Sequence, residues 1–153
     1  MKSIHGGDIY NNKVNMDFSV NINPLGIPHS VKEAMSDALS YADRYPDMAC
    51  SDLKKAISEY FTQQGCSIQS EDVIPGNGAS ELFMAIAHAI KPQKAVLLSP
   101  GFFGYEHVLR AVGCDIGYFL LYEQSDFSPA ARLDALMDML TDDTDIFFIA
   151  NPN

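Results

Sequence analysis

The stretch that decides the fold is AVLLSPGFFGYEHVLRAVGCDIGYFLL, residues 95–121. Two apolar runs, Ala95–Leu98 and Ile116–Leu121, stand on either side of a helical pattern at 103–112. Continuous apolar runs, in contrast to alternating ones, are typical of strands buried on both faces, as parallel sheets require. The stretch therefore predicts a strand, a helix and a second strand that runs parallel to the first.

The same alternation continues on both sides of this stretch. Short apolar runs also occur at Val73–Ile74 and Ile146–Ile149, and helical patterns at 79–90 and 129–140. Three helices among four candidate strands indicate an α/β fold, with a mostly parallel sheet flanked by helices and right-handed crossovers. We assign residues 70–153 to the first part of a large α/β domain, truncated at its end.

Residues 1–69 have a different pattern. The first 28 residues are rich in Gly, Asn and Pro and predict an extended arm with turns. A helix is expected to open at Pro28-His29-Ser30, because Ser30 and Glu33 have capping-box spacing. A second helix is expected from about Ser51 until Gly65 ends it. We interpret residues 1–69 as an amino-terminal arm and helices that precede the large domain.

Composition narrows the classes of function. The chain has 153 residues, of which 47% are hydrophobic and 20% charged, with a net charge of −10. An acidic protein repels phosphate backbones and anionic lipids, so we expect neither nucleic acid nor a membrane as partner. The three cysteines lack metal-ligand spacing, which favours a reducing compartment and no metal site. With no run of 18 apolar residues, the sequence predicts a soluble, cytoplasmic protein.

Gly-, Pro- and Asn-rich segments follow three of the candidate strands: PGNGAS at 75–80, SPGFFGY at 99–105 and NPN at 151–153. In open α/β sheets, ligands bind beyond the carboxyl ends of the strands. A helix that begins after Gly78 can hold a phosphate through its free N–H groups, and Phe102 can stack on a planar ring. Taken singly, the first loop also fits an ordinary strand-to-helix turn, and the second fits core aromatic residues.

Six motifs occur in a fixed order: HGGDIY (5–10), DFSVNINPLGIP (17–28), RYPD (44–47), IPGNGASE (74–81), SPGFFGYE (99–106) and ANPN (150–153). In that order they resemble the amino-terminal half of the pyridoxal 5′-phosphate-dependent class I/II aminotransferase superfamily, fold type I. Within it the chain most resembles the L-threonine-O-3-phosphate decarboxylases of cobalamin biosynthesis, and next the histidinol-phosphate aminotransferases. The HGG start and NINP at 21–24 favour the decarboxylases, which usually carry Asn in place of Asp8.

The resemblance implies a set of cofactor contacts. The N–H groups of Ala79 and Ser80, which follow Gly78, would bind the phosphate of pyridoxal phosphate. Phe102 would stack on its pyridine ring, where relatives often carry Tyr. Tyr45 of the RYPD motif would reach the cofactor phosphate of a neighbouring subunit, which implies a homodimer.

The resemblance also implies substrate contacts: Asn21 would help to hold the carboxylate of a phosphorylated amino acid, and His5 with Gly6 its phosphate. In the family, the lysine that carries the cofactor, the Asp that pairs with the pyridine nitrogen and the Arg that grips the carboxylate follow the ANPN motif. None of the seven lysines here has the family's Ser-rich setting. We therefore expect an enzyme fragment without a catalytic residue, inactive by itself and poorly soluble or strongly associating. The alternative of another class is a non-catalytic binding module, if the chain is naturally this short.

Overall fold

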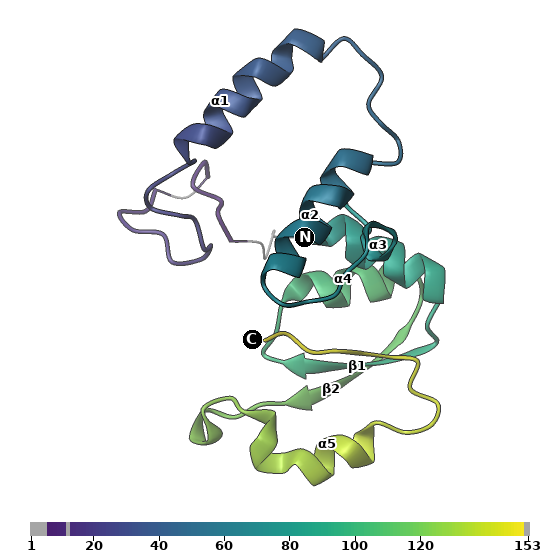
Figure 1. Ribbon diagram of the computed structural model, residues 1–153. Coiled ribbons are helices and arrows are strands. Elements are labelled where there is room, and N and C mark those ends of the chain that lie inside the picture. The colour runs from purple at the N-terminus through teal and green to yellow at the C-terminus, as the bar shows by residue number, and fades with distance from the viewer. Residues whose placement is uncertain (1–5, 12, 152–153) are drawn as a thin grey trace. The chain divides into compact units, whose positions relative to one another are not determined.

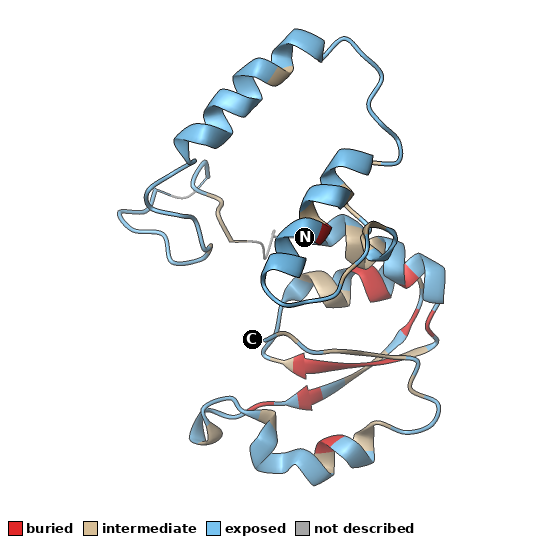
Figure 2. Cartoon of the chain, in the orientation of Figure 1, coloured by how far each residue is buried: buried red, intermediate tan, exposed pale blue. Residues whose placement is uncertain are grey.

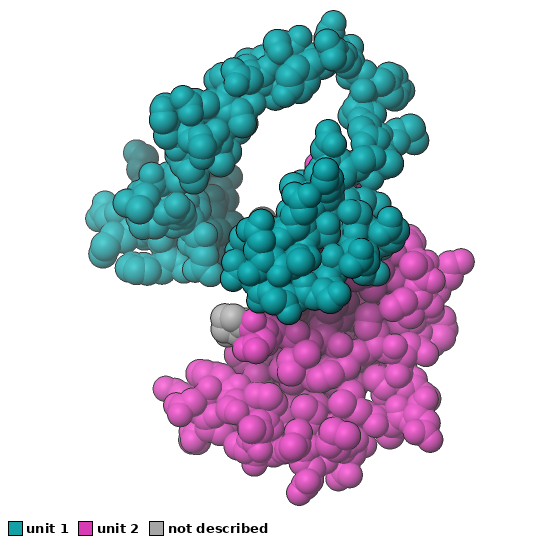
Figure 3. Space-filling model, viewed as in Figure 1, with its two compact units in different colours: residues 1–75 teal, residues 76–153 magenta. Residues whose placement is uncertain are grey.

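The computed structural model describes residues 6–11 and 13–151 and divides into two compact units, 1–75 and 76–153 (Figures 1 and 3). The first unit holds α1 (His29–Ala38), η1 (Leu39–Tyr41), α2 (Ser51–Gln63) and η2 (Ser70–Asp72). The second holds α3 (Ala79–Ile90), β1 (Lys94–Ser99), α4 (Phe103–Ala111), β2 (Asp115–Leu120), η3 (Glu123–Ser125), η4 (Pro129–Arg132), α5 (Leu133–Met139) and β3 (Ile146–Phe148). The domain boundary between residues 69 and 70 that the sequence suggests stays a prediction.

The second unit is built on a parallel sheet with the strand order β2-β1-β3. β1 pairs with β2 from Lys94 opposite Asp115 to Ser99 opposite Leu120, and with β3 from Ala95 opposite Ile146 to Leu97 opposite Phe148. The predicted α/β fold, with a parallel sheet flanked by helices, is thus confirmed.

The central strand, β1, is buried on both faces (Figure 2). Ala95 and Leu97 point into one core cluster, and Val96 and Leu98 into the other. The first cluster is completed by residues of α3 and α4 and the residue before β2: Ala87, Val108, Leu109 and Cys114. The second is completed by residues from the end of β2 and from α5: Phe119, Leu121 and Leu136. Successive side chains of β1 enter the two clusters in turn, so every position from Ala95 to Leu98 is apolar.

The two connections between strands run in opposite directions across the sheet, the first from β1 to β2 and the second from β2 to β3. The first, through α4, leads to β2 at one edge of the sheet, and the second, through α5, crosses to β3 at the other edge. Two crossovers of the same hand that run in opposite directions place their helices on opposite faces. The packing agrees, because α4 contributes to the first core cluster and α5 to the second.

Three local expectations are wrong. Val73–Ile74 is extended but has no strand partner, and Val73 N–H instead donates to Ser70 O at 3.3 Å, closing η2. The described residues thus contain three strands, not four. The first helix begins at His29 after Pro28 without a side-chain cap, so Ser30 is not its cap. The helical pattern at 129–140 divides into η4 and α5 at Arg132, whose φ of −139° and ψ of 40° are not helical, and α5 ends at Met139.

In the first unit, Asp47 of the RYPD motif starts the second helix. Its carboxylate accepts hydrogen bonds from the N–H groups of Ala49 at 2.9 Å and Ser51 at 2.7 Å. These bonds, that from Ser51 foremost, lower the pKa of the Asp47 carboxyl. α2 then runs to Gln63 and closes at Gly65, whose φ of +85° suits glycine, as expected. In the described part of the chain, no helix has the length and apolar character needed to cross a membrane.

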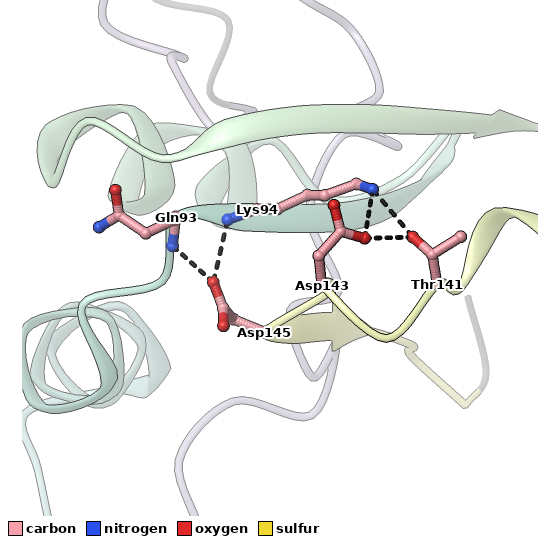
Figure 4. A network of polar contacts seen from close by, with 5 residues as sticks. All are labelled: Gln93, Lys94, Thr141, Asp143 and Asp145. Carbon is pink, nitrogen blue, oxygen red and sulfur yellow. Dashed lines mark hydrogen bonds and ion pairs between the residues drawn. The ribbon is translucent and has the colours of Figure 1, made fainter.

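A polar network joins the amino-terminal ends of β1 and β3 (Figure 4). One carboxylate oxygen of Asp145 accepts hydrogen bonds from the backbone N–H groups of Gln93 at 2.7 Å and Lys94 at 3.1 Å. The Lys94 ammonium donates to Thr141 Oγ1 at 2.9 Å and pairs with Asp143 at 2.8 Å. The hydrogen bond from Lys94, followed by that from Thr141, lowers the pKa of the Asp143 carboxyl. Of these contacts, that of Asp145 ties β3 to the backbone of β1 directly.

We expect Asp145→Ala to lower the free energy of unfolding by about 1–2 kcal/mol, because two backbone donors lose a charged acceptor. Urea denaturation measures this change. Asp143→Asn is the matched control: it removes the charge of an exposed ion pair, keeps an acceptor oxygen for Thr141, and should shift the urea midpoint far less. Equal effects of the two substitutions would contradict the assigned role of Asp145.

Candidate functional site

The carboxyl ends of the parallel strands meet at one edge of the second unit. β1 ends at Ser99, whose carbonyl accepts a hydrogen bond from Leu121 N–H at 2.7 Å, just beyond the end of β2. The segment 100–102 then leads into α4. α3 reaches the same edge: only residues 91–93 separate its last residue from β1, so the helix returns along the sheet with its first turn at the carboxyl edge.

The loop 76–78 precedes α3, and its backbone has a conformation that requires glycine. Gly78, the residue before the helix, has φ +84° and ψ 167°, a region essentially restricted to glycine. No side chain caps the first turn, and a Cβ built on Gly78 meets no heavy atom within 4 Å. Gly76 is constrained differently, because a Cβ there would lie 2.8 Å from the Leu82 side chain. The N–H groups at the start of α3 therefore have no side-chain cap, and Ala79 and Ser80, which begin the helix, are exposed.

Four aromatic rings hold α3, α4 and β3 together at this edge. Phe83, one turn into α3, lies 6.3 Å from Phe102, 4.9 Å from Tyr105 and 5.8 Å from Phe148 between ring centroids. Tyr105 stacks on Phe148 at 4.6 Å with an interplanar angle of 15°. These contacts bring the predicted phosphate loop and the predicted stacking residue into one neighbourhood.

Phe102 is the member of this cluster that reaches the surface. Its ring meets Tyr105 edge-on at 5.4 Å, yet 42% of the residue is exposed. Gly104 lies under the ring, and a Cβ at that position would overlap the ring atoms of Phe102. Each of the two alternatives for this loop therefore holds for one residue: Tyr105 belongs to the packed aromatic cluster, while Phe102 contacts that cluster and is 42% exposed.

The start of the ANPN motif lies at the same edge. Ala150 and Asn151 follow β3 and line a cavity of about 350 Å³. Its other lining residues come from β1, from just after β2 and β3, and from the loop into η4: Leu98, Leu121, Ile149, Asp126, Phe127 and Pro129. Pro152 and Asn153, the rest of the motif, lie outside the described residues.

The predicted substrate residues belong to the first unit. His5 lies outside the described residues, while Gly6 is half-buried against Ser19, whose carbonyl a Cβ on Gly6 would overlap. Gly7 N–H donates to Ser19 Oγ at 2.8 Å, and the Ser19 hydroxyl in turn donates to Asp17 at 2.6 Å. This side-chain bond, with the backbone bond from Ser19, lowers the pKa of the Asp17 carboxyl. The HGG segment thus has a defined turn rather than a flexible start from Gly6 onward.

Asp8, which replaces the usual Asn of the decarboxylases, has a local role. Its Oδ1 accepts hydrogen bonds from Asn11 N–H at 3.1 Å and from Asn11 Nδ2 at 3.0 Å, closing a turn. Asn21 and Tyr45 are both exposed, Tyr45 to 93%. Their predicted contacts, with the substrate carboxylate and with a neighbouring subunit's cofactor, stay predictions.

The carboxyl edge of the second unit fits two parts of pyridoxal phosphate. The uncapped first turn of α3 suits the phosphate, and the exposed ring of Phe102 suits the face of the pyridine. Within residues 76–151 the lysines are Lys91, at the end of α3, and Lys94, the first residue of β1. Both lie at the amino-terminal end of β1, away from the carboxyl end where the candidate site lies. This unit therefore offers non-covalent contacts to the cofactor and no lysine at the same edge.

Several residues of this edge were not singled out from the sequence. Phe83 packs against Phe102, and Phe148 packs against Phe83 and Tyr105; the only available signal was their place on a predicted helix and strand. Tyr105 follows Phe102 by three residues, a spacing that brings side chains together where a helix begins. Glu81 also belongs here, because its carboxylate accepts a hydrogen bond from Asn77 N–H in the loop before α3.

Known proteins are similar to this chain in both sequence and fold. The threonine-phosphate decarboxylase of Salmonella typhimurium is 36% identical over 138 residues, which are 90% of this chain and 36% of that protein. A putative threonine-phosphate decarboxylase of Caldanaerobacter subterraneus is 38% identical over 151 residues, 97% of this chain and 38% of that protein. Histidinol-phosphate aminotransferase 1 of Mannheimia succiniciproducens is 31% identical over 139 residues, 87% of this chain and 34% of that protein. The chain thus spans little more than a third of the length of these relatives.

Solved structures agree on the fold. A mutant aspartate aminotransferase of Thermus thermophilus matches with a TM-score of 0.72 at 23% identity, over 82% of this chain and 34% of that one. The histidinol-phosphate aminotransferase of Clostridium acetobutylicum matches with a TM-score of 0.64 at 26% identity, over 88% of this chain and 37% of that one. The sequence profile described as aminotransferase class I and II matches residues 13–153. With nine-tenths of its residues matched by that profile, and with the parallel sheet and its carboxyl-edge loops in place, the chain belongs to the class I and II aminotransferase family.

Proposed function

We propose that the chain is the amino-terminal part of a pyridoxal phosphate-dependent enzyme that acts on a phosphorylated amino acid, and that its reaction is the decarboxylation of threonine phosphate. The observation that carries this proposal is the 36% identity, over 90% of the chain, with a threonine-phosphate decarboxylase. Histidinol-phosphate transamination is the second candidate, favoured by relatives of 31% and 34% identity. The proposed enzyme would act in cobalamin biosynthesis and would be located in the cytoplasm.

In this proposal, the second unit binds the cofactor. Ala79 and Ser80 donate their backbone N–H groups to its phosphate, with Gly78 giving the loop its turn, and Phe102 stacks on its ring. When bound, pyridoxal phosphate withdraws electrons from the substrate's α-carbon and so stabilises the charge left when a bond to that carbon breaks. The contribution of these residues is to hold the ring and the phosphate in place.

The first unit supplies substrate recognition in this proposal. Asn21 holds the substrate carboxylate, while His5 and Gly6 hold the substrate phosphate. Tyr45 contacts the cofactor phosphate of the second subunit in a homodimer, and its high exposure in a single chain is in keeping with that role. Which bond of the α-carbon breaks depends on how these contacts orient the substrate, so decarboxylation and transamination differ in positioning rather than in a new catalytic group.

The protein expressed from its native gene should have an intact mass above the 16.8 kDa of this chain. Supplied with pyridoxal phosphate and O-phosphothreonine, it should release carbon dioxide and leave the corresponding amino alcohol phosphate, with a proton replacing the carboxylate. Formation of a keto acid in the presence of an acceptor would instead identify an aminotransferase. A mass of 16.8 kDa without turnover would favour the non-catalytic binding module.

Ala79→Pro tests the proposed phosphate contact without removing the helix. Ala79 is the first residue of α3, where proline is tolerated, and the substitution deletes one N–H donor. We expect about tenfold weaker binding of pyridoxamine 5′-phosphate, the loss of one hydrogen bond to a charged group, in equilibrium dialysis. Circular dichroism should be unchanged, and pyridoxamine, which lacks the phosphate, should bind wild type and variant alike. Equal binding of the phosphorylated probe to both proteins would remove Ala79 from the site.

Gly104→Ala tests Phe102 as a stacking surface. The new Cβ would overlap the ring and force it to turn away, so the affinity for pyridoxamine 5′-phosphate should fall by about three- to tenfold, the range of one aromatic stacking contact. Gly113→Ala is the control, a glycine with φ +76° after α4 and outside the aromatic cluster. It should reduce stability without changing the dissociation constant of the folded protein.

A further inference from the structure

Glu81, in the first turn of α3, turns its carboxylate back onto the loop before the helix. Its Oε2 accepts a hydrogen bond from the N–H group of Asn77, which stands between the two glycines. In the same loop, Gly78 N–H donates to Gly76 O at 2.9 Å, closing a tight turn about Asn77. A Cβ on Gly76 would lie 3.3 Å from the same carboxylate oxygen, so the Glu81 side chain lies against this loop.

The Asn77 N–H group precedes the helix and has no place in its hydrogen-bond ladder. Glu81 thus gives a partner to a backbone donor that the hydrogen bonds of the helix cannot satisfy. The bond joins the first turn of α3 to the middle of the loop and restrains the backbone between two glycines, which would otherwise have wide conformational freedom.

The charge of Glu81 has the opposite consequence for an anionic ligand. A carboxylate in the first turn of a helix is stabilised by the helix dipole when no ligand is bound. When a phosphate binds the N–H groups of Ala79 and Ser80, the same carboxylate becomes a like charge nearby. The oxygen of Glu81 therefore favours phosphate binding by fixing the loop, while its charge opposes it.

We propose that Glu81 is a positioning residue of the cofactor site: it holds the Gly76–Gly78 loop in the shape that presents the α3 N–H groups, and it weakens phosphate affinity by its charge. This role rests on the proposed function of the loop. The two effects are separable by substitution, because Glu81→Gln keeps an acceptor oxygen and loses the charge, whereas Glu81→Ala loses both.

The dissociation constant of pyridoxamine 5′-phosphate, measured by equilibrium dialysis, tests both the positioning effect and the charge effect of Glu81. Glu81→Gln should bind about two- to fivefold more tightly than wild type, the size of one first-turn charge at a helix N-terminus. Glu81→Ala should bind at least about threefold more weakly than Glu81→Gln, because these two variants differ in the loop's hydrogen bond. Asp134→Asn, which removes the first-turn acid of α5, is the matched control and should leave the constant unchanged.

Hydrogen exchange of the peptide 76–82, followed by mass spectrometry without ligand, gives a readout independent of binding. Exchange should be faster in Glu81→Ala than in Glu81→Gln or wild type. Equal binding and equal exchange of the two variants would overturn the positioning role, and Glu81→Gln binding no tighter than wild type would overturn the charge effect. Absence of binding by wild type would overturn the proposed cofactor site, and this inference with it. That result is distinguishable from the other two, in which wild type still binds.

Discussion

The burial of β1 on both faces is the constraint on which the second unit depends. A strand in this position must have a hydrogen-bonded neighbour on each edge and a hydrophobic layer on each face, since its backbone and side chains are both removed from water. β2 and β3 supply the edges, and α3 with α4 and α5 supply the faces. The order β2-β1-β3 and the opposite placement of α4 and α5 follow from this one requirement together with a fixed crossover hand.

In the same arrangement, the amino-terminal and carboxyl-terminal ends of the strands carry different kinds of polar groups. At the amino-terminal edge, Asp145 and the Lys94–Asp143 pair connect strand ends through their own side chains, and no glycine-dependent loop is present between α3 and β1. At the carboxyl edge, the polar groups are backbone N–H groups at the start of α3, and aromatic rings do the packing. Polar side chains therefore join the strands at one end of the sheet, while the other end has uncapped backbone donors and the partly exposed ring of Phe102, where we propose the cofactor site.

Much of this could be predicted from the sequence, because the period of the apolar residues differs between helix and buried strand. α3 and β1 fall within a residue of their predicted positions, and the predicted loops after the strands lie at the carboxyl end of the sheet, as the rule for parallel strands requires. Val73–Ile74 was wrong for a physical reason: an apolar pair is a strand only if a partner strand lies beside it, and pairing is a long-range property. The roles of Phe83 and Glu81 were also inaccessible, since a ring contact or a backward hydrogen bond depends on three-dimensional packing that spacing does not encode.

The division of site residues between the two units bears on how the family could change its reaction. The proposed cofactor contacts, Ala79, Ser80 and Phe102, are held by the sheet, by a glycine conformation and by a packed aromatic cluster. Substitutions there disturb the core as well as the ligand. The proposed substrate contacts lie in an arm whose turns are held by local hydrogen bonds, such as those of Ser19 with Gly7 and Asp17. An arm of this kind can be reshaped at little cost to the core, so a change of substrate or of the bond that breaks is more accessible there than in the cofactor site.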